Sequence, residues 1–275
     1  ARPPPERLLA GPPPHAVRPH RSPSRVGAGS TVELVAPRSV LDAGAGPGTA
    51  TWAAAQLWDS LEDATLVEAS AAIRAVGERL GLPLPHVSWH AARLDVALAD
   101  LSLSDLVLLA YVLDELPPAT REPLIRQLWR LTGDTLLIVE PGTPAGWNRI
   151  LHARDLLIQA GAHILAPCPH AHPCPLAAPD WCHFSARVAR SRLHREAKGG
   201  TVPWEDEKFI YVAASRRPGV QPEARVIAPP QASKAAMTLK LCQQDGYAAD
   251  RVYAKRAGDS FKTARRLDWG GIVRK

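Results

Sequence analysis

Residues 41–52 read LDAGAGPGTATW, and this stretch decides the fold class. The apolar run before it is typical of a strand, the alternating glycines of a tight loop, and residues 49–58 of a helix. Glycines at such a turn let the backbone approach a ligand closely, and the N-terminus of the helix faces that ligand. The spacing D-x-G-x-G-x-G differs from the G-x-G-x-x-G of dinucleotide sites, which disfavours a nicotinamide enzyme. The stretch therefore predicts a ligand-binding turn in an α/β fold.

Strand and helix patterns alternate downstream of this turn. The run at 104–113 is continuously apolar, as expected of a strand buried on both faces. We expect the other strands and the helices at 64–70, 71–81, 86–94, 120–133 and 134–142, and Leu124, Leu128 and Leu131 share one face of the helix at 120–133. This alternation predicts a parallel, doubly wound sheet.

The rhythm changes after Gly142. Residues 148–165 read as a helix followed by an extended piece, and residues 181–200 as a strongly basic helix that ends at a glycine pair. A strand at 207–217 and short antiparallel strands are expected beyond, at 224–230, 237–247, 251–256 and 260–270. Three regions follow: a proline- and arginine-rich disordered arm over 1–37, a Rossmann-like domain over 38–165, and a region over 166–275 that holds an irregular loop, the basic helix and a small β-rich C-terminal extension.

The bulk composition limits the class of protein. A chain of 275 residues with 46% hydrophobic residues can bury a full core, and no apolar run approaches the roughly 20 residues that cross a bilayer. The net charge of +6 suggests a polyanionic partner, nucleic acid first, although a generic basic surface has the same charge. The N-terminal tract resembles a transit peptide in composition, but its prolines disfavour an amphipathic helix. We expect a reducing compartment, no membrane or secreted partner, and a monomer when free.

The glycine motif resembles the first motif of class I S-adenosylmethionine-dependent methyltransferases. That resemblance implies that Asp42 helps to hold the amino group of the methionine part of the cofactor, beside the loop of Gly44, Gly46 and Gly48. It also implies that Glu68, the acid that ends the second strand, binds both ribose hydroxyls. Asp95 follows the third strand and is a candidate for a contact with adenine, with a solvated loop acid as the alternative. For the motif as a whole, the alternative is a tight turn that binds nothing.

Residues 110–118 read AYVLDELPP, at the end of the fourth predicted strand, where these enzymes present the methyl acceptor. The [DN]-P-P-[YFW] motif of amino-methylating enzymes is absent, and no cysteine nucleophile lies nearby. Tyr111 is a candidate for stacking on the cofactor or a base, and Asp114 or Glu115 for accepting a proton. The alternative is that both acids cap the next helix. The sequence thus supports methyl-donor binding better than methyl transfer.

Residues 168–182 read CPHAHPCPLAAPDWC and hold three of the four cysteines in the chain. Four thiolates are the ligand set of a closed zinc site or of an iron–sulfur cluster. The C-x2-C knuckles of structural zinc are absent, and the wide spacing favours a larger cluster. His170, His172 or His183 is a possible substitute for one ligand, and four unrelated thiols are the alternative. The predicted ligands are Cys168, Cys174, Cys182 and Cys242.

Taken together, these motifs resemble the methyltransferase-like seventeen family (the Rsm-twenty-two type) associated with the mitochondrial small ribosomal subunit, and its bacterial relatives. The resemblance covers the chain from Ser39 onward, and its segments are LDAGAGPGTATWAA, YVLDELP, IVEPGTPAGWNRILHARDLLIQAGAHILAPCPH, DWCHF and EDEKFIYVAASR. It implies a [4Fe–4S] cluster on the four cysteines, with zinc as the alternative, and action on small-subunit ribosomal RNA. It implies a cytoplasmic location for a bacterial member and the mitochondrial matrix for a eukaryotic one. Relatives carry a helical segment where this chain has its proline-rich tract.

The predicted basic helix carries the candidate RNA contacts. Arg187, Arg190 and Lys198 recur there at helical spacing, with Arg195 beside them, and a solvated helix face is the alternative. Basic residues in YAKR and KTARR extend such a surface over the β-rich end. We favour an S-adenosylmethionine-binding, methyltransferase-like protein with a cluster that acts on small-subunit ribosomal RNA. The second hypothesis is a non-catalytic assembly factor that uses the fold as an RNA-binding platform, with zinc instead of a cluster. Radical chemistry is set aside because its C-x3-C-x2-C loop is absent.

Overall fold

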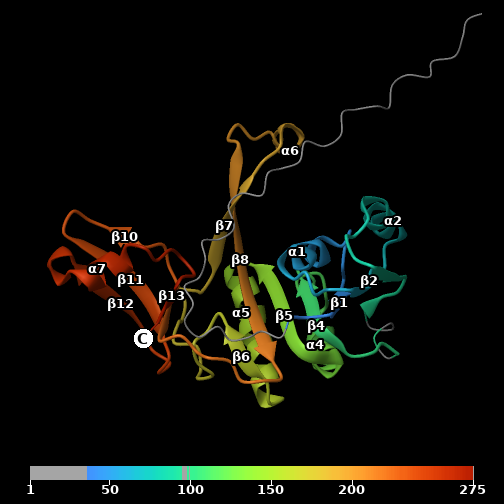
Figure 1. The fold of residues 1–275 in the computed structure, drawn as a ribbon, viewed down its shortest axis with the longest axis horizontal. Coiled ribbons are helices and arrows are strands. Elements are labelled where there is room, and N and C mark those ends of the chain that lie inside the picture. Colours follow the sequence, from blue (N-terminus) through green and yellow to red (C-terminus); the bar gives the residue numbers. More distant parts are fainter. Residues whose placement is uncertain (1–35, 95–97, 99, 275) are drawn as a thin grey trace, which may run out of the picture. The chain divides into compact units, whose positions relative to one another are not determined.

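The protein is described by a computed structural model, which covers residues 36–94, 98 and 100–274 (Figure 1). Its helices are α1 (Thr49–Leu57), α2 (Ala71–Leu80), α4 (Pro118–Leu131), α5 (Pro144–Gln159), α6 (Arg192–Lys198), α7 (Asp259–Ala264) and the 3₁₀ turn η1 (Lys255–Ala257). The strands of the main sheet are β1 (Ser39–Ala43), β2 (Asp63–Val67), β3 (His86–His90), β4 (Ser104–Ala110), β5 (Thr132–Pro141), β6 (His163–Ala166), β7 (Phe184–Ala189) and β8 (Trp204–Ser215). The N-terminal tract over residues 1–37, expected to be disordered, lies almost wholly outside the described residues.

The main sheet has the strand order β3-β2-β1-β4-β5-β8-β6, and β7 pairs with β8. Strands β1 to β5 run parallel to their neighbours, as predicted. Strand β8 runs antiparallel to both β5 and β6, so the prediction of a wholly parallel sheet is wrong at this edge. The physical reason is the connection before β8. Strands β7 and β8 form a hairpin through α6, with no helix crossing a face of the sheet between them, so β8 joins the sheet in the opposite direction. The strand order is that of the Rossmann-like α/β fold of class I methyltransferases.

Both faces of the sheet are buried, which confirms the doubly wound prediction. Val40 and Leu41 are neighbours in β1 and belong to different apolar layers, because successive side chains of a strand point to opposite faces. On one layer α4 contributes Leu124, Leu128 and Leu131, the three residues that the sequence places on one helix face. Among the described residues, no helix has the length and apolar character to cross a membrane.

The predicted basic helix over 181–200 is wrong in its first half. Residues 184–189 form β7, which pairs with β8 in a hairpin from Phe184 opposite Phe209 to Ala189 opposite Trp204. Only α6 is helical, and Figure 1 shows it at the tip of this hairpin. Pairing with a strand far along the sequence overrides the local helical spacing, because strand formation depends on the partner more than on intrinsic preference. We call β7, α6 and the first half of β8 the arm.

The C-terminal region forms a second sheet, as its β-rich pattern predicts. Its strands are β9 (Ala224–Val226), β10 (Gln231–Ala232), β11 (Ala236–Gln243), β12 (Ala248–Ala254) and β13 (Ile272–Val273), in the order β10-β11-β9-β13 with β12 beside β11. The predicted strand at 260–270 is wrong, because this segment begins with α7. Phe261, Ala264 and Leu267 recur every three residues and pack on the sheet, which is a helical pattern.

Candidate functional site

The glycine loop between β1 and α1 has a backbone that favours glycine at three positions. Gly44, Gly46 and Gly48 have φ values of 72°, 56° and 85°, in the left-handed region that costs other residues free energy. A Cβ at Gly44 would lie 2.6 Å from a methyl group of Val112, whereas a Cβ at Gly46 would meet nothing within 4 Å. The loop therefore packs against Val112 at Gly44 and is open at Gly46.

Asp42 is directed into the fold. Its side chain is 1% exposed, and Oδ2 accepts hydrogen bonds from the backbone N–H of Thr51 (3.2 Å) and its hydroxyl (2.7 Å). Burial is the main reason that the pKa of Asp42 rises to about 6, and the two bonds from Thr51 oppose the rise. Asp42 thus ties β1 to α1. Its expected contact with a methionine amino group stays a prediction.

Glu68 lies beside the open part of the loop. Oε2 accepts from the N–H of Gly46 (3.0 Å) and Oε1 from the N–H of Ser70 (2.7 Å), so the carboxylate joins the glycine loop to the start of α2. Each carboxylate oxygen has a second acceptor position, which leaves capacity for ligand hydroxyls. The structure brings Glu68 and Gly46 together as the sequence predicts. Asp95, the adenine candidate, lies outside the described residues.

Tyr111 lies at the end of β4, next to Val112 that packs under the loop. Its φ of 60° makes it the only non-glycine residue with positive φ in the described part of the chain, and it is 49% exposed. The backbone N–H donates to the carbonyl of Val139 (2.8 Å). Burial, with Glu207 and Glu140 nearby, raises the pKa of its hydroxyl. A strained, half-exposed aromatic residue at a strand end is a candidate for a functional role.

The two candidate acids at the acceptor position differ. Asp114 forms an ion pair with Arg149 (2.7 Å), which also binds the fully buried Glu140 (2.6 Å). Glu140 further accepts from the N–H of Leu113 (3.1 Å), and burial raises its pKa. Glu115 is exposed. Because α4 has no side-chain cap at its N-terminus, the capping alternative is wrong.

Glu140 and Arg149 were missed by the sequence reasoning. The available signal was a single acid, Glu140, at the end of an otherwise apolar strand, where an unpaired charge is costly and a cation is expected nearby. The network fixes the loop after β4 and engages the Asp114 carboxylate with a cation. Asp114 is therefore poorly placed to accept a proton from a substrate.

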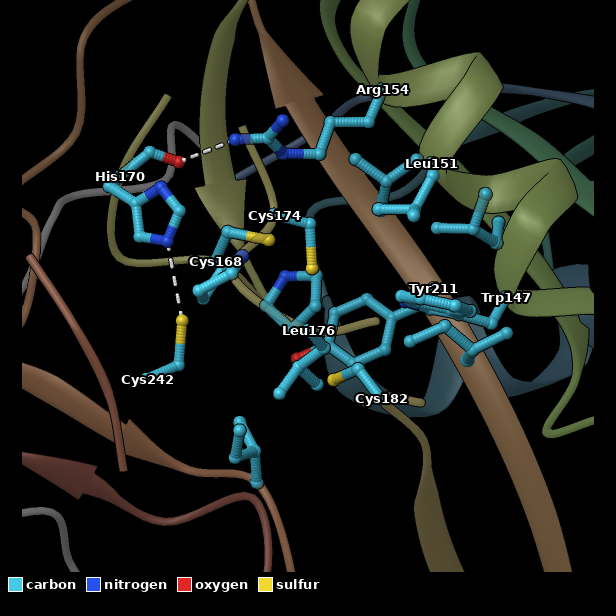
Figure 2. Close-up of a pocket in the computed structure, with 16 residues that line it drawn as sticks. Trp147, Leu151, Arg154, Cys168, His170, Cys174, Leu176, Cys182, Tyr211 and Cys242 are labelled. Atoms are coloured by element: carbon cyan, nitrogen blue, oxygen red, sulfur yellow. Dashed lines mark hydrogen bonds between the residues drawn. The ribbon is translucent and has the colours of Figure 1, made fainter. Parts of the chain in front are cut away.

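The four cysteines line a single cavity, shown in Figure 2. All four are free thiols, and the structure places the loop cysteines Cys168, Cys174 and Cys182 around this space together with Cys242 of β11. The cavity measures about 30 Å³, more than the roughly 10–15 Å³ that one water needs. The structure thus brings together all four predicted cysteines. Of the three candidate histidines, His170 lines the cavity, and its Nε2 lies 3.3 Å from the sulfur of Cys242.

Burial raises the pKa of all four thiols, and that of Cys242 reaches about 12. The thiols are therefore neutral in the absence of a metal, and binding one would release protons. Arg154 opposes this effect at Cys168, Cys174 and Cys242, because its positive charge favours the thiolates. A charged residue thus lies next to the space that the thiols surround.

Arg154 is 1% exposed and comes from α5. Its guanidinium donates to the backbone carbonyls of His170 (3.0 Å) and His172 (2.7 Å) and to Asp155 (3.1 Å). Three residues of the cavity wall carry a buried side-chain nitrogen without a hydrogen-bond partner: Arg154 (Nε), Trp147 (Nε1) and His170 (Nδ1). The positive charge of Arg154 beside the thiols suits an anionic group.

The geometry does not form a site for a single metal ion. In residues 36–94, 98 and 100–274, no three histidine, cysteine, aspartate or glutamate side chains are grouped as ligands of one ion. Tetrahedral zinc, with Zn–S distances of about 2.3 Å, needs sulfur atoms within roughly 3.8 Å of each other. The thiols surround a shared space instead, so the predicted metal centre stays a prediction.

The candidate RNA contacts of the arm are not a helical stripe. Arg187 lies in β7 and Lys198 in α6, so the prediction that they share a helix face with Arg190 is wrong. Arg187 forms an ion pair with Asp206 (2.7 Å) and Arg190 with Glu205 (2.7 Å), across the hairpin. Arg195 lies in α6 with its Nε buried and without a partner.

Three comparisons relate the chain to known proteins. Residues 27–274 match the family model described as "Mitochondrial small ribosomal subunit Rsm22". The chain is 31% identical over 259 residues to the human "Ribosome assembly protein METTL17, mitochondrial", which covers 86% of this chain and 55% of that protein. It is 26% identical over 194 residues to "Rsm22-cox11 tandem protein 2, mitochondrial" of Schizosaccharomyces pombe, covering 54% of this chain and 26% of that protein. The chain thus spans about half the length of the human relative.

Among solved structures, the chain is similar to magnesium protoporphyrin IX methyltransferase from Synechocystis with bound SAM. The identity is 14%, the TM-score is 0.41, and the alignment covers 65% of this chain and 69% of that one. The fold assignment rests on the strand order of the main sheet, not on this partial likeness.

Proposed function

We propose that this chain, which belongs to the Rsm22 family of the mitochondrial small ribosomal subunit, is an assembly factor that binds S-adenosylmethionine and small-subunit ribosomal RNA. The human relative that supports this role is named as a mitochondrial ribosome assembly protein. The mitochondrial matrix is the proposed location for a eukaryotic member, and the cytoplasm for a bacterial one. The methyltransferase fold acts in this proposal mainly as a binding platform.

One contrast carries the proposal: the donor end of the fold is open, whereas at the acceptor end the candidate base Asp114 is already engaged by a cation. At the donor end the loop is open at Gly46 and Glu68 retains acceptor capacity toward a ribose. At the acceptor end Asp114 is paired with Arg149, which Glu140 holds in place. Such a site suits a bound cofactor better than a proton-abstracting reaction.

The cysteine cavity supports a resident [4Fe–4S] cluster, for which Cys168, Cys174, Cys182 and Cys242 would be the ligands. The buried positive charge of Arg154, which favours the thiolates of Cys168, Cys174 and Cys242, suits an anionic cluster–thiolate group. When bound, the cluster would supply a covalent link between the loop and β11. Its role in this proposal is structural, because metal binding and folding are coupled.

A second candidate function is methylation of ribosomal RNA, with Tyr111 as the residue that favours it. Its strained backbone at the end of β4 holds a half-exposed ring at the position where an acceptor base would stack. A strain from which the gene is deleted, complemented with either wild type or Gly46→Arg, separates the two functions. If the chain is a binding platform, wild type restores small-subunit assembly and no methyl mark on the ribosomal RNA depends on the gene. A methyl mark that wild type restores and Gly46→Arg does not would establish the enzyme.

Cofactor binding has a direct test in two matched glycine substitutions. Gly46 and Gly161 both have positive φ and both leave open space at a Cβ, but Gly161 lies in the turn between α5 and β6. We expect Gly46→Arg to weaken S-adenosylmethionine binding at least tenfold, because the side chain occupies the open loop, and Gly161→Arg to leave the affinity unchanged. Isothermal titration of both variants measures this. Equal affinities would contradict the assigned site.

A further inference from the structure

One of the strongly basic segments of the chain lies near its C-terminus. Residues 250–266 hold six lysine and arginine residues against two aspartates, a net charge of +4 out of +6 for the whole chain. They include the end of β12, the turn η1 and the helix α7. Residues 187–198 have the same net charge of +4, so the two segments differ in how their cations are partnered and not in their charge. A polyanionic partner would recognise the cations that are not already paired.

Helix α7 turns its cations away from the core. Phe261 and Ala264 pack on the C-terminal sheet. Lys262 lies in α7, and Arg265 and Arg266 follow in the turn that directly continues it. The spacing i, i+3 and i+4 over this helix and its last turn places the three away from Phe261 and Ala264. All three are exposed. The apolar contacts of α7 thus fix the direction in which its charges point.

Two further exposed cations precede α7, in η1, which packs against it. We call the five residues the basic face: Lys255, Arg256, Lys262, Arg265 and Arg266. Lys262 is paired with Asp259 (3.0 Å), while the other four form no ion pair with any described residue. The six residues of α7 span about 9 Å, so the cations that precede the helix in η1 and those that follow it can contact different phosphates of one strand.

Most arginines of the arm are already paired with acids. Arg187 pairs with Asp206, Arg190 with Glu205, and Arg192 with Glu196 (2.7 Å). A phosphate that contacted these arginines would compete with an acid already bound to each. The cations of the basic face have no such competitor in four of five cases, so counterion release on binding a polyanion is larger there.

The basic face fits a nucleic-acid backbone better than a membrane. Helices that bind membranes present large apolar side chains beside their cations. Here the apolar residues of α7 face the sheet, and among residues 250–266 Val252 of β12 is the single exposed large apolar side chain. Cations without apolar anchors are typical of phosphate contacts.

We propose that the basic face, and not the arm, is the surface through which this protein binds the phosphate backbone of RNA. The inference rests on the proposed function for the identity of the RNA, and it places the contacts in the C-terminal sheet region. It assigns the main electrostatic contribution to Lys255, Arg256, Arg265 and Arg266.

The test compares two sets of four substitutions in the full chain. One set changes Lys255, Arg256, Arg265 and Arg266 to glutamine, and the matched set changes Arg187, Arg190, Arg192 and Arg195 to glutamine. Binding to small-subunit ribosomal RNA and to oligouridylate is measured between low and high salt. For the basic-face set we expect affinity to fall at least tenfold and the log–log salt slope to shrink by about 3, since each phosphate contact contributes roughly 0.7–0.9. For the arm set we expect a slope change below about 1.

Thermal melting of both variants checks that each is folded. We expect the basic-face variant to melt like wild type, because its four substituted residues are exposed. A larger slope change in the arm set, or none in either set while wild type binds RNA, would overturn the inference but leave the proposed function standing. If wild type bound anionic phospholipid vesicles or an acidic peptide and not ribosomal RNA, both the inference and the proposed function would fail.

Discussion

Asp42 is a buried carboxyl group whose two hydrogen bonds from Thr51 join the first strand to the first helix. Its environment is nearly free of water, and desolvation outweighs those bonds, so its pKa lies at about 6 instead of 3.8. The folded protein therefore binds a proton at Asp42 in a pH range where the unfolded chain has lost it. The contribution of this group to stability is present below pH 3.8 and is lost as the pH rises through about 6.

This residue gives a prediction about pH. We expect Asp42→Asn to remove the effect, because the amide oxygen can still accept from Thr51 and carries no charge. Between pH 4 and 7 the wild type should lose roughly 2–3 kcal/mol of unfolding free energy relative to the variant. Urea denaturation across that range measures the difference, with Asp59→Asn on the exposed surface as the control. Parallel pH profiles of wild type and Asp42→Asn would contradict the assignment.

Single residues also show how far the sequence predicts the site. Gly44, Gly46 and Glu68 can be predicted as candidates because each belongs to a local sequence pattern at a strand end. Arg149 was missed because its partners, Asp114 and Glu140, lie on other elements that come together only in the fold. Long-range ion pairs leave no periodic signal in a sequence.

At the scale of elements, α5 holds the cysteine loop through one side chain. The guanidinium of Arg154 binds the carbonyls of His170 and His172 in the middle of a loop that has no regular structure between β6 and β7. Prolines limit the conformations of that loop, but its backbone carbonyls need donors. Arg154 supplies them from the neighbouring helix and adds a positive charge beside the thiols.

We therefore expect Arg154→Met to destabilise the metal-free, reduced protein by roughly 2–4 kcal/mol, because the buried carbonyl of His170 and the partly buried carbonyl of His172 lose their donor. Arg126→Met is the control, since Arg126 is exposed and pairs with Glu122 one helical turn away; such pairs contribute about 0.5 kcal/mol or less. Chemical denaturation under reducing, metal-free conditions compares the two. Losses of equal size would show that Arg154 does not organise the loop.

Two elements were predicted wrongly, for different physical reasons. Strand β7 reads as helix because Arg187 and Arg190 have helical spacing with Lys198, yet its pairing with β8 fixes an extended backbone. Helix α7 reads as strand because the segments around it are strands, although its apolar residues recur every three positions. The first error is a tertiary effect that no local pattern records, whereas the second had a local signal that was not used.

At the scale of the whole molecule, Cys242 connects the two sheets to one cavity. It lies in β11 of the C-terminal sheet, while Cys168, Cys174 and Cys182 belong to the loop between β6 and β7 of the main sheet. A cluster on these four residues would hold the region that carries the basic face to the region that carries the glycine loop. Loss of the cluster would then weaken RNA binding without any change at the RNA contacts.

The most direct test is a count of iron, sulfide and zinc per chain after anaerobic purification of wild type and Cys242→Ser. Our account predicts about four irons and four sulfides in wild type with absorption near ~400 nm, as expected of a cluster on four thiolates, and loss of most of both in the variant. One zinc without sulfide, or no bound metal at all, would contradict it.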